Sequence, residues 1–444
     1  MVFTTYEFVL FLACVTALYY TAFKRAQWQF LLAASVAFYA YSGWRNLLFI
    51  AVTVVTTFIA ARCMARLQGK RERRPWLIAA LTVNIGILLT LKFTRLAFPL
   101  GLSFFTLQTM SYLIDAYRAK DGDAVERNPF KLALFTSFFP QLLQGPMSRY
   151  GTLKRELFEP HAFSGANVSA GLERIALGYF KKLVIADRVM PVIGGLSYPV
   201  AAAVYAVALY CDFTGGIDVA IGVAKLLGIT LTENFDSPYY SRNIQEFWRR
   251  WHMTMGAWFR DYVFSPLSTS LPSIRLAAPC KRAFGDRIGR RVPIWLTIMV
   301  TWFATGLWHG ADAHFIVWGL ANGAVIIVSQ ELTNSSRDFA RKFPRLTASK
   351  VFDAFRIVRT FCLMSLIRSL DWTIMRESSA ALGTSDWLCA GLATLFVVFY
   401  SRLRQKRSSP EFNLAFACVM VVLIAVFGAY GQGYSVSQFI YTRF

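Results

Sequence analysis

Two residue types that often carry protein chemistry are scarce in this chain. It contains four histidines and seven cysteines among 444 residues. The cysteines are scattered, no two of them form a Cys-x-x-Cys pair, and none has the spacing of a metal site. The sequence therefore predicts no metal ligands, and the few histidines become the first candidates for a titratable functional group.

Acidic residues are also few. The chain has 25 Asp and Glu against 47 Lys and Arg, which gives a net charge of +22. Such a charge could serve nucleic acid binding. However, basic clusters such as 62–74 and 281–291 fall between apolar runs, and Lys and Arg collect in this way in cytoplasmic loops that contact anionic lipid. The pattern favours membrane lipid, and not nucleic acid, as the partner of this charge.

Polar regions long enough to form a soluble domain are missing as well, because 56% of the residues are hydrophobic and apolar runs recur from end to end. We predict an all-α polytopic membrane protein with about 10–12 transmembrane or re-entrant helices and no separate soluble domain. The N-terminus lacks the basic region of a cleaved signal, so the first span is retained. The clearest spans are 7–23, 28–42, 46–61, 76–92, 293–309, 313–329, 386–400 and 413–430.

Other segments are less uniform. Residues 148–170 and 268–291 are polar and basic, and we predict loops there. Residues 97–114 and 130–147 are apolar but contain glutamines, prolines and glycines. Polar and helix-breaking residues are tolerated at membrane depth where they are buried in protein or line a cavity. These two runs predict either kinked helices packed on their neighbours or the lining of a cavity.

Three of the four histidines lie in two aromatic stretches, of which the first is 241–267, SRNIQEFWRRWHMTMGAWFRDYVFSPL. Its apolar residues recur at helical spacing. We predict one amphipathic helix that Asn243 caps and in which Glu246 pairs with Arg250. His252 falls on the apolar face of this helix. It is either part of a functional site or a buried histidine that is hydrogen-bonded to a backbone carbonyl.

The second stretch is 305–323, TGLWHGADAHFIVWGLANG. His309 lies at the end of an apolar run, and Gly310 follows it. Glycine permits a helix end or a close backbone approach at that point. An ionisable group at membrane depth is costly and is therefore a functional candidate. Because an imidazole can take up a proton near neutral pH, His309 is the first candidate for acid–base chemistry.

Two carboxylates interrupt the apolar run 198–229. They are Asp212 and Asp218, and charged groups at such a position are expensive. They predict either ion pairs with basic groups of another helix or a polar path through the protein.

These stretches resemble the membrane-bound O-acyltransferase family. Within it they are similar to the bacterial branch that holds the alginate O-acetylation proteins and the D-alanyl transfer protein of teichoic acids. The resemblance covers most of the chain from about residue 98 onward. It rests on GLSFFTLQTMSYLID (101–115), FFPQLLQGPMSRY (138–150), YFKKLVIADR (179–188), YCDFTGGIDVAIG (210–222), ENFDSPYY (233–240) with the first aromatic stretch, GLWHGADAHFIVWGL (306–320) and FIYTRF (439–444).

The resemblance implies a multi-helix bundle around a central funnel. The family's two motif histidines correspond to His252 and His309, and they would meet near the middle of the bacterial plasma membrane. A single integral membrane acyltransferase domain is implied over residues 1–444. It would comprise N-terminal helices at 1–95, a catalytic core at 96–335 and C-terminal helices at 336–444.

The resemblance also implies a reaction, which is O-acyl transfer to a hydroxyl of a cell-surface polysaccharide or of an extracytoplasmic relay partner. His309 would act as general base or form an acyl-imidazole. His252 would orient the donor or donate a hydrogen bond to the developing oxyanion. The residues expected to wall the site or to support it are Trp248, Trp251, Trp308, Trp318, Asp212 and Asp218.

We expect no cofactor to stay bound, because the acyl group would arrive as a cytoplasmic thioester. Acetyl-coenzyme A would suit a polysaccharide acceptor, and D-alanine on an acidic carrier protein would suit teichoic acid. The GLWHG sequence at 306–310 is closer to the alginate-type members, which favours acetyl. The alternatives from other classes are a transporter, because intramembrane carboxylates and broken helices also occur there, and a non-catalytic scaffold.

Overall fold

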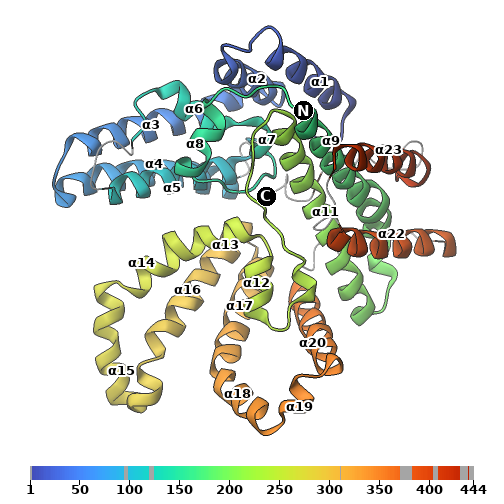
Figure 1. Ribbon diagram of the computed structural model, residues 1–444. Helices are drawn as coiled ribbons and strands as arrows, with labels where there is room; N and C mark the ends of the chain where they lie inside the picture. Colours follow the sequence, from blue (N-terminus) through green and yellow to red (C-terminus); the bar gives the residue numbers. More distant parts are fainter. Residues whose placement is uncertain are drawn as a thin grey trace. The chain divides into compact units, whose positions relative to one another are not determined.

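The structure is a computed structural model that describes residues 3–94, 99–119, 125–310, 312–370, 383–403, 409–430 and 439. In this part of the chain every regular element is a helix (Figure 1). The chain divides into two compact units. The first comprises Met1–Arg188, Leu209–Thr232 and Gly383–Phe444, and the second comprises Val189–Ala208 and Glu233–Leu382. The predicted all-α class is confirmed, whereas the predicted regions 1–95, 96–335 and 336–444 stay a prediction.

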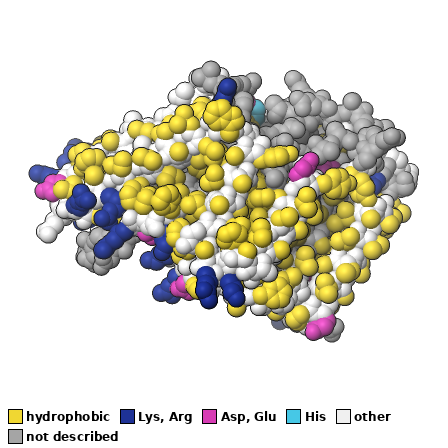
Figure 2. Space-filling view, turned by 90° about the horizontal axis from the view of Figure 1, so that it is seen from above, with side chains coloured by type: hydrophobic (Ala, Val, Ile, Leu, Met, Phe, Trp, Pro, Cys, Tyr) yellow, Lys and Arg dark blue, Asp and Glu magenta, His cyan; other side chains and the backbone are white. Residues whose placement is uncertain are grey.

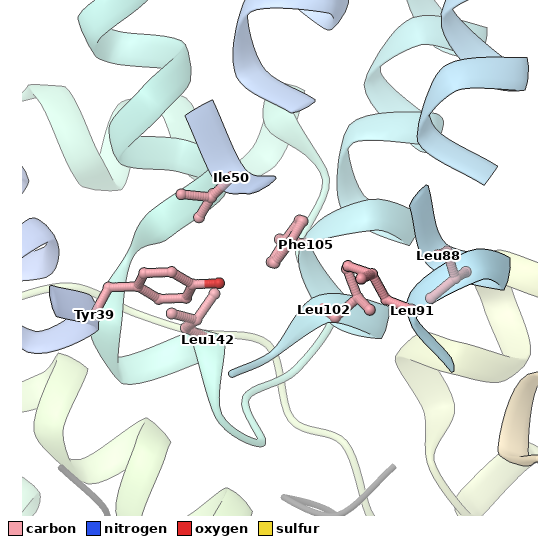
Figure 3. Close-up of a cluster of buried hydrophobic side chains, with 7 residues drawn as sticks. All are labelled: Tyr39, Ile50, Leu88, Leu91, Leu102, Phe105 and Leu142. Carbon is pink, nitrogen blue, oxygen red and sulfur yellow. The ribbon is translucent and has the colours of Figure 1, made fainter. Parts of the chain in front are cut away.

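The first unit begins with helices in the predicted order. α1 (Tyr6–Tyr20) and α2 (Gln27–Tyr41) match the spans predicted at 7–23 and 28–42 within a few residues, whereas α3 (Leu47–Arg66) and α4 (Lys70–Thr94) extend beyond 46–61 and 76–92. α5 (Leu102–Arg118) overlaps the interrupted run 97–114. Helices α3, α4 and α5 pack side by side (Figure 1). A buried apolar cluster joins these helices to α2 and to α7 (Phe139–Leu142) (Figure 3). Its members are Tyr39, Ile50, Leu88, Leu91, Leu102, Phe105 and Leu142.

The polar-interrupted run at 130–147 does not form one helix. It divides at Phe138 into α6 (Pro129–Ser137) and the short α7. Gln141 and Gln144 are buried, and the side-chain amide of Gln108 on α5 donates to the carbonyl oxygen of Phe135 at 3.1 Å. The run 130–147 is therefore broken and buried, and whether it lines a cavity stays a prediction. Residues 97 and 98 of the other interrupted run lie outside the described residues.

Glycines let two helices of the first unit approach each other closely. They lie on α9 (Gly165–Phe180) and on the part of α11 (Tyr198–Leu226) that begins at Leu209. A Cβ atom on Gly171 would lie 2.9 Å from the carbonyl oxygen of Gly222, and one on Gly178 would lie 2.6 Å from that of Gly215. We call these four residues the glycine seam. It packs backbone against backbone, as small residues do between membrane helices.

The second unit contains the two histidine stretches. Its helices are α12 (Ile244–Arg250), α13 (Met253–Phe259), α14 (Ser265–Ser268), α15 (Leu271–Gly289), α16 (Val292–His309), α17 (Ala313–Glu331), α18 (Thr333–Lys342), α19 (Pro344–Thr347) and α20 (Lys350–Arg368). Helices α16 and α17 run antiparallel along their length as a hairpin (Figure 1). The short connection between them begins at Gly310, directly after His309.

The loops predicted at 148–170 and 268–291 were wrong in large part, because they contain α8 (Tyr150–Phe158), the start of α9, and α15. These segments lack apolar runs, but they carry the local signals that start a helix. The Ser270 hydroxyl accepts a hydrogen bond from the Ser273 backbone N–H, and Pro272 occupies the first turn. Capping of this kind starts a helix without an apolar stripe.

Five of the described helical segments are long and apolar enough to cross a membrane. They are Trp44–Arg66, Lys70–Thr94, Tyr198–Leu226, Ala313–Glu331 and Pro410–Phe427, the last of which is α23. Tyr6–Tyr20 and Trp387–Tyr400, which lies within α22 (Thr384–Leu403), are shorter apolar helices. Large apolar side chains are exposed, including Leu48 and Val55 on α3, and yellow side chains predominate on the face in Figure 2. The chain is a multi-pass membrane protein, and the expected count of about 10–12 membrane helices stays a prediction.

Candidate active site

The first aromatic stretch is not the single helix that its periodicity predicts. The Asn243 cap and the pair between Glu246 and Arg250, at 2.9 Å, are confirmed. However, α12 ends at Arg250, and the chain turns sharply at His252, which has φ 46° and ψ 52°. This left-handed conformation is uncommon for a residue other than glycine. The single helix was wrong, and His252 lies in the turn between α12 and α13.

Contacts from an upstream segment explain the turn. The backbone N–H of Asp236 donates to the Arg250 carbonyl at 3.0 Å, and the N–H of Met253 donates to the Asn234 carbonyl at 2.9 Å. These bonds pair residues 234–236 with the end of α12 and the start of α13. His252, the residue with the left-handed conformation, lies between these two hydrogen bonds. Backbone strain of this kind persists where the surroundings over-determine the conformation, and it occurs often at functional sites.

The His252 imidazole is buried, with 5% of the residue exposed. Its Nδ1 atom lies 3.1 Å from Nδ2 and 3.2 Å from Oδ1 of Asn234. The partner of Nδ1 is thus a side-chain amide, and not the backbone carbonyl that one of the two alternatives for His252 predicted. His252 lies outside the five candidate spans, and burial lowers the pKa of its imidazole to about 3. Its ring is therefore neutral at physiological pH.

His309 is the last residue of α16 and is also buried. Its ring lies between aromatic side chains. The Trp318 indole meets it edge to face, with ring centroids 5.0 Å apart, and the Phe315 ring lies nearly parallel to it at 6.0 Å. The neighbouring Trp308 ring is 4.6 Å away. These contacts fix the plane of the imidazole and exclude bulk water from its surroundings.

Close packing of α16 on α17 brings these rings together. A Cβ atom on Gly306 would lie 2.5 Å from the Phe315 carbonyl oxygen, and one on Gly319 would lie 2.4 Å from that of Trp302. A Cβ atom on Gly310 would lie 2.4 Å from the Phe315 ring. The glycines therefore allow the end of α16 to rest against the start of α17, and the expected close approach after His309 is confirmed.

One network of ring contacts joins the two histidines within the second unit. His252 stacks on Phe235 at 6.3 Å, and Phe235 meets the edge of Trp251 at 5.1 Å. The path continues through Phe247 to Trp248, and Trp248 contacts Trp318 at 6.0 Å. The four predicted wall residues Trp248, Trp251, Trp308 and Trp318 all belong to this network or touch His309. The sequence reading missed Asn234, Phe235, Trp302 and Phe315, although each lies within or beside a motif.

Two polar groups also reach this network. The indole N–H of Trp248 is buried and has no hydrogen-bond partner within the described residues. The Arg368 guanidinium lies over the Trp318 ring, 5.5 Å from its centroid. A buried N–H group usually has a partner, so the Trp248 indole can donate to a bound molecule.

Asp212 and Asp218 lie in the first unit, where they form buried ion pairs. Asp218 accepts from Arg174 Nε and Lys181 Nζ, both at 2.6 Å, and Asp212 accepts from Lys182 Nζ at 2.7 Å. The predicted pairing with basic groups of another helix is confirmed. The expected supporting role of Asp212 and Asp218 at the active site stays a prediction.

Among the described residues, no three His, Cys, Asp or Glu side chains converge in a group that could hold a metal ion.

Comparisons with known proteins place this geometry in context. The model of the MBOAT, membrane-bound O-acyltransferase family, matches residues 36–277. A peptidoglycan O-acetyltransferase of Helicobacter pylori is 30% identical over 454 residues, which cover 89% of this chain and 82% of the relative. A probable alginate O-acetylase AlgI of Azotobacter vinelandii is 29% identical over 473 residues, with 96% and 85% covered. A teichoic acid D-alanyltransferase of Bacillus subtilis is 28% identical over 281 residues, with 59% and 65% covered.

Proposed function

Because the chain belongs to the membrane-bound O-acyltransferase family and is an O-acyltransferase, we propose that it transfers an acetyl group from a cytoplasmic thioester to a hydroxyl of a cell-surface polysaccharide. The acceptor hydroxyl belongs to the polymer itself or to an extracytoplasmic relay protein. Support for acetyl comes from two relatives whose names specify O-acetylation, because their alignments cover more of this chain than that of the D-alanyltransferase.

The observation that carries the proposal is the placement of His309. A buried imidazole, held between aromatic rings at the end of a helix, can take up and return a proton in surroundings that exclude water. The donor is acetyl-coenzyme A or an acylated carrier protein. The acidic carrier would be attracted by the basic cytoplasmic face of a chain of charge +22 in the bacterial plasma membrane.

The reaction follows from these roles. The acceptor oxygen attacks the thioester carbonyl carbon, and its proton passes to a ring nitrogen of His309. The carbonyl oxygen becomes an oxyanion, and His252 donates a hydrogen bond to it. When the intermediate collapses, the carbon–sulfur bond breaks and the leaving thiolate takes the proton back from the His309 imidazolium. The products are an ester and a free thiol, and His309 returns to its neutral state.

The test measures ester-linked acyl groups that mild base releases from the cell envelope. It compares wild-type cells, a deletion strain, and the deletion strain carrying His309→Ala at equal expression. His161→Gln is the matched control, because His161 lies in the first unit and its ring bonds to the Glu156 carbonyl at 2.7 Å.

We expect one acyl species to disappear in the deletion and in His309→Ala, and to persist in His161→Gln. If the species that disappears is acetate, the acetyl assignment holds. If it is D-alanine, the transferred group is D-alanyl and the acetyl assignment is wrong. Full acylation in the His309→Ala strain would overturn the catalytic role of His309 and would favour a transporter or a scaffold.

A further inference from the structure

Asn234 is bound to the His252 turn at several points. It is fully buried. Its backbone carbonyl accepts from the N–H of Met253 at 2.9 Å. Its side-chain Oδ1 accepts from the backbone N–H of Thr254 at 3.1 Å and from the Thr254 hydroxyl at 2.9 Å. Asn234 therefore caps the first turn of α13 from a distance, because the His252 side chain at the N-cap position makes no capping bond.

The Thr254 bonds determine which way round the Asn234 amide lies. A backbone N–H can only donate, so the amide atom facing it must be the oxygen. The NH₂ group of the amide is then the atom 3.1 Å from Nδ1 of His252. The orientation of the Asn234 amide thus follows from the backbone N–H of Thr254.

The same contacts determine which nitrogen of His252 carries the proton. The Asn234 oxygen has two lone pairs, and the two Thr254 donors occupy them. The remaining group that faces Nδ1 is an amide N–H, which can only donate. Nδ1 must therefore accept with its lone pair, and in a neutral imidazole the proton then lies on Nε2.

We propose that Asn234 is a positioning residue that holds His252 in the Nε2–H tautomer, so that His252 acts in acyl transfer as a hydrogen-bond donor to the thioester oxyanion and not as a base. This inference rests on the proposed function. It assigns different work to the two histidines, because only His309 moves a proton. The low pKa that burial gives His252 agrees with this role, since a neutral ring in this tautomer always presents one donor.

The tautomer can be measured directly, whatever the substrate is. The full-length protein is labelled with ¹⁵N-histidine, and its four histidines are observed by NMR in lipid nanodiscs. The His252 signals are identified by their loss in His252→Gln. We expect a protonated Nε2 and an unprotonated Nδ1 from about pH 5 to about pH 8. A proton on Nδ1 would overturn the proposal.

A single substitution separates positioning from capping. Asn234→Asp keeps an oxygen for both Thr254 donors, but the group that faces Nδ1 becomes an oxygen that only accepts. We expect the proton to move to Nδ1 and kcat for acetyl transfer from labelled acetyl-coenzyme A to isolated envelopes to fall by about 10²–10³-fold, as when an oxyanion donor is lost. KM should change less than kcat, because the donor acts mainly in the transition state.

Asn243→Asp is the matched control. Asn243 caps α12 by accepting from the Glu246 N–H at 2.8 Å, and an aspartate performs this task equally well. We expect wild-type activity from it. Wild-type activity in Asn234→Asp would show that Asn234 only caps α13, and it would overturn the proposal. If the wild-type protein transfers no acetyl although the predicted tautomer is present, the proposed function fails and the tautomer assignment stands.

Discussion

The imidazole of His309 meets the indole of Trp318 edge to face, with their planes at 84° and their centroids 5.0 Å apart. The two residues come from different helices, since His309 ends α16 and Trp318 lies one to two turns into α17. The orientation of the proposed base therefore depends on the spacing between these helices. That spacing depends on Gly306 on α16 and Gly319 on α17.

Gly319→Ala should separate α16 from α17. Its new Cβ atom would lie 2.4 Å from the Trp302 carbonyl oxygen, so the helices must shift. Overpacking of this kind costs about 1–3 kcal/mol, and a small displacement of a catalytic group lowers kcat strongly. Thermal unfolding and acetyl transfer would both be measured. Gly86→Ala on α4 is the control, because nothing lies within 4 Å of its Cβ position. Equal behaviour of the two variants would contradict the role of Gly319.

Trp248→Phe should weaken substrate binding or turnover without unfolding the protein. Phenylalanine retains ring contacts with Trp302 and Trp318 but lacks the buried N–H. Loss of one hydrogen bond corresponds to about 0.5–1.5 kcal/mol, or up to roughly tenfold in kcat/KM. Trp295→Phe removes an N–H that donates to Glu331 at 3.2 Å and should leave the kinetics unchanged. Unaltered kinetics in Trp248→Phe would show that the Trp248 N–H does not bind the substrate.

Asp218→Asn should destabilise the first unit. The carboxylate is shared by Arg174 and Lys181, and all three side chains are less than 10% exposed. Removing one partner of a buried ion pair costs about 3–5 kcal/mol, because charge remains buried with weaker compensation. Denaturation in detergent would measure the loss. Asp286→Asn, which breaks an exposed pair with Arg290, should change stability little. A stable Asp218→Asn protein would argue that water reaches this cluster.

The pH dependence of acyl transfer between about pH 5 and about pH 8 should not depend on His252. Burial lowers the pKa of its imidazole to about 3, so His252 stays neutral over this range. His252→Gln should therefore reduce the rate at every pH and leave the midpoint of the profile in place. A shifted midpoint would show that His252 also titrates during turnover.

The helix hairpin that carries His309 could be predicted closely from the sequence. The spans predicted at 293–309 and 313–329 became α16 at Val292–His309 and α17 at Ala313–Glu331. Apolar periodicity and the glycine after His309 are local signals, and here the tertiary structure follows them. Which side chains meet His309 could not be read in this way, because that depends on the contact between Gly306 and Gly319.

The turn at His252 could not be predicted from periodicity, and its cause is non-local. The amide that contacts the ring lies 18 residues upstream, and two of its bonds cap α13. The apolar residues from Ile244 to Phe259 keep a helical spacing on both sides of the turn. The spacing therefore gives no sign that the helix is interrupted at His252. An asparagine before an aromatic stretch has many uses, and nothing in its immediate neighbours marks it as the partner of His252.

The glycine seam has a consequence for motion. Gly171 and Gly178 on α9 meet Gly222 and Gly215 on α11 backbone to backbone, and the ion pairs of Asp212 and Asp218 lie on the same stretch of α11. Sliding one helix by a turn would drive side chains into the opposite carbonyl groups and pull apart the buried charges. We expect the amides of this pair to be among the slowest in the chain to exchange hydrogen for deuterium, and the opening motions that admit donor and release product to arise in more loosely packed helices.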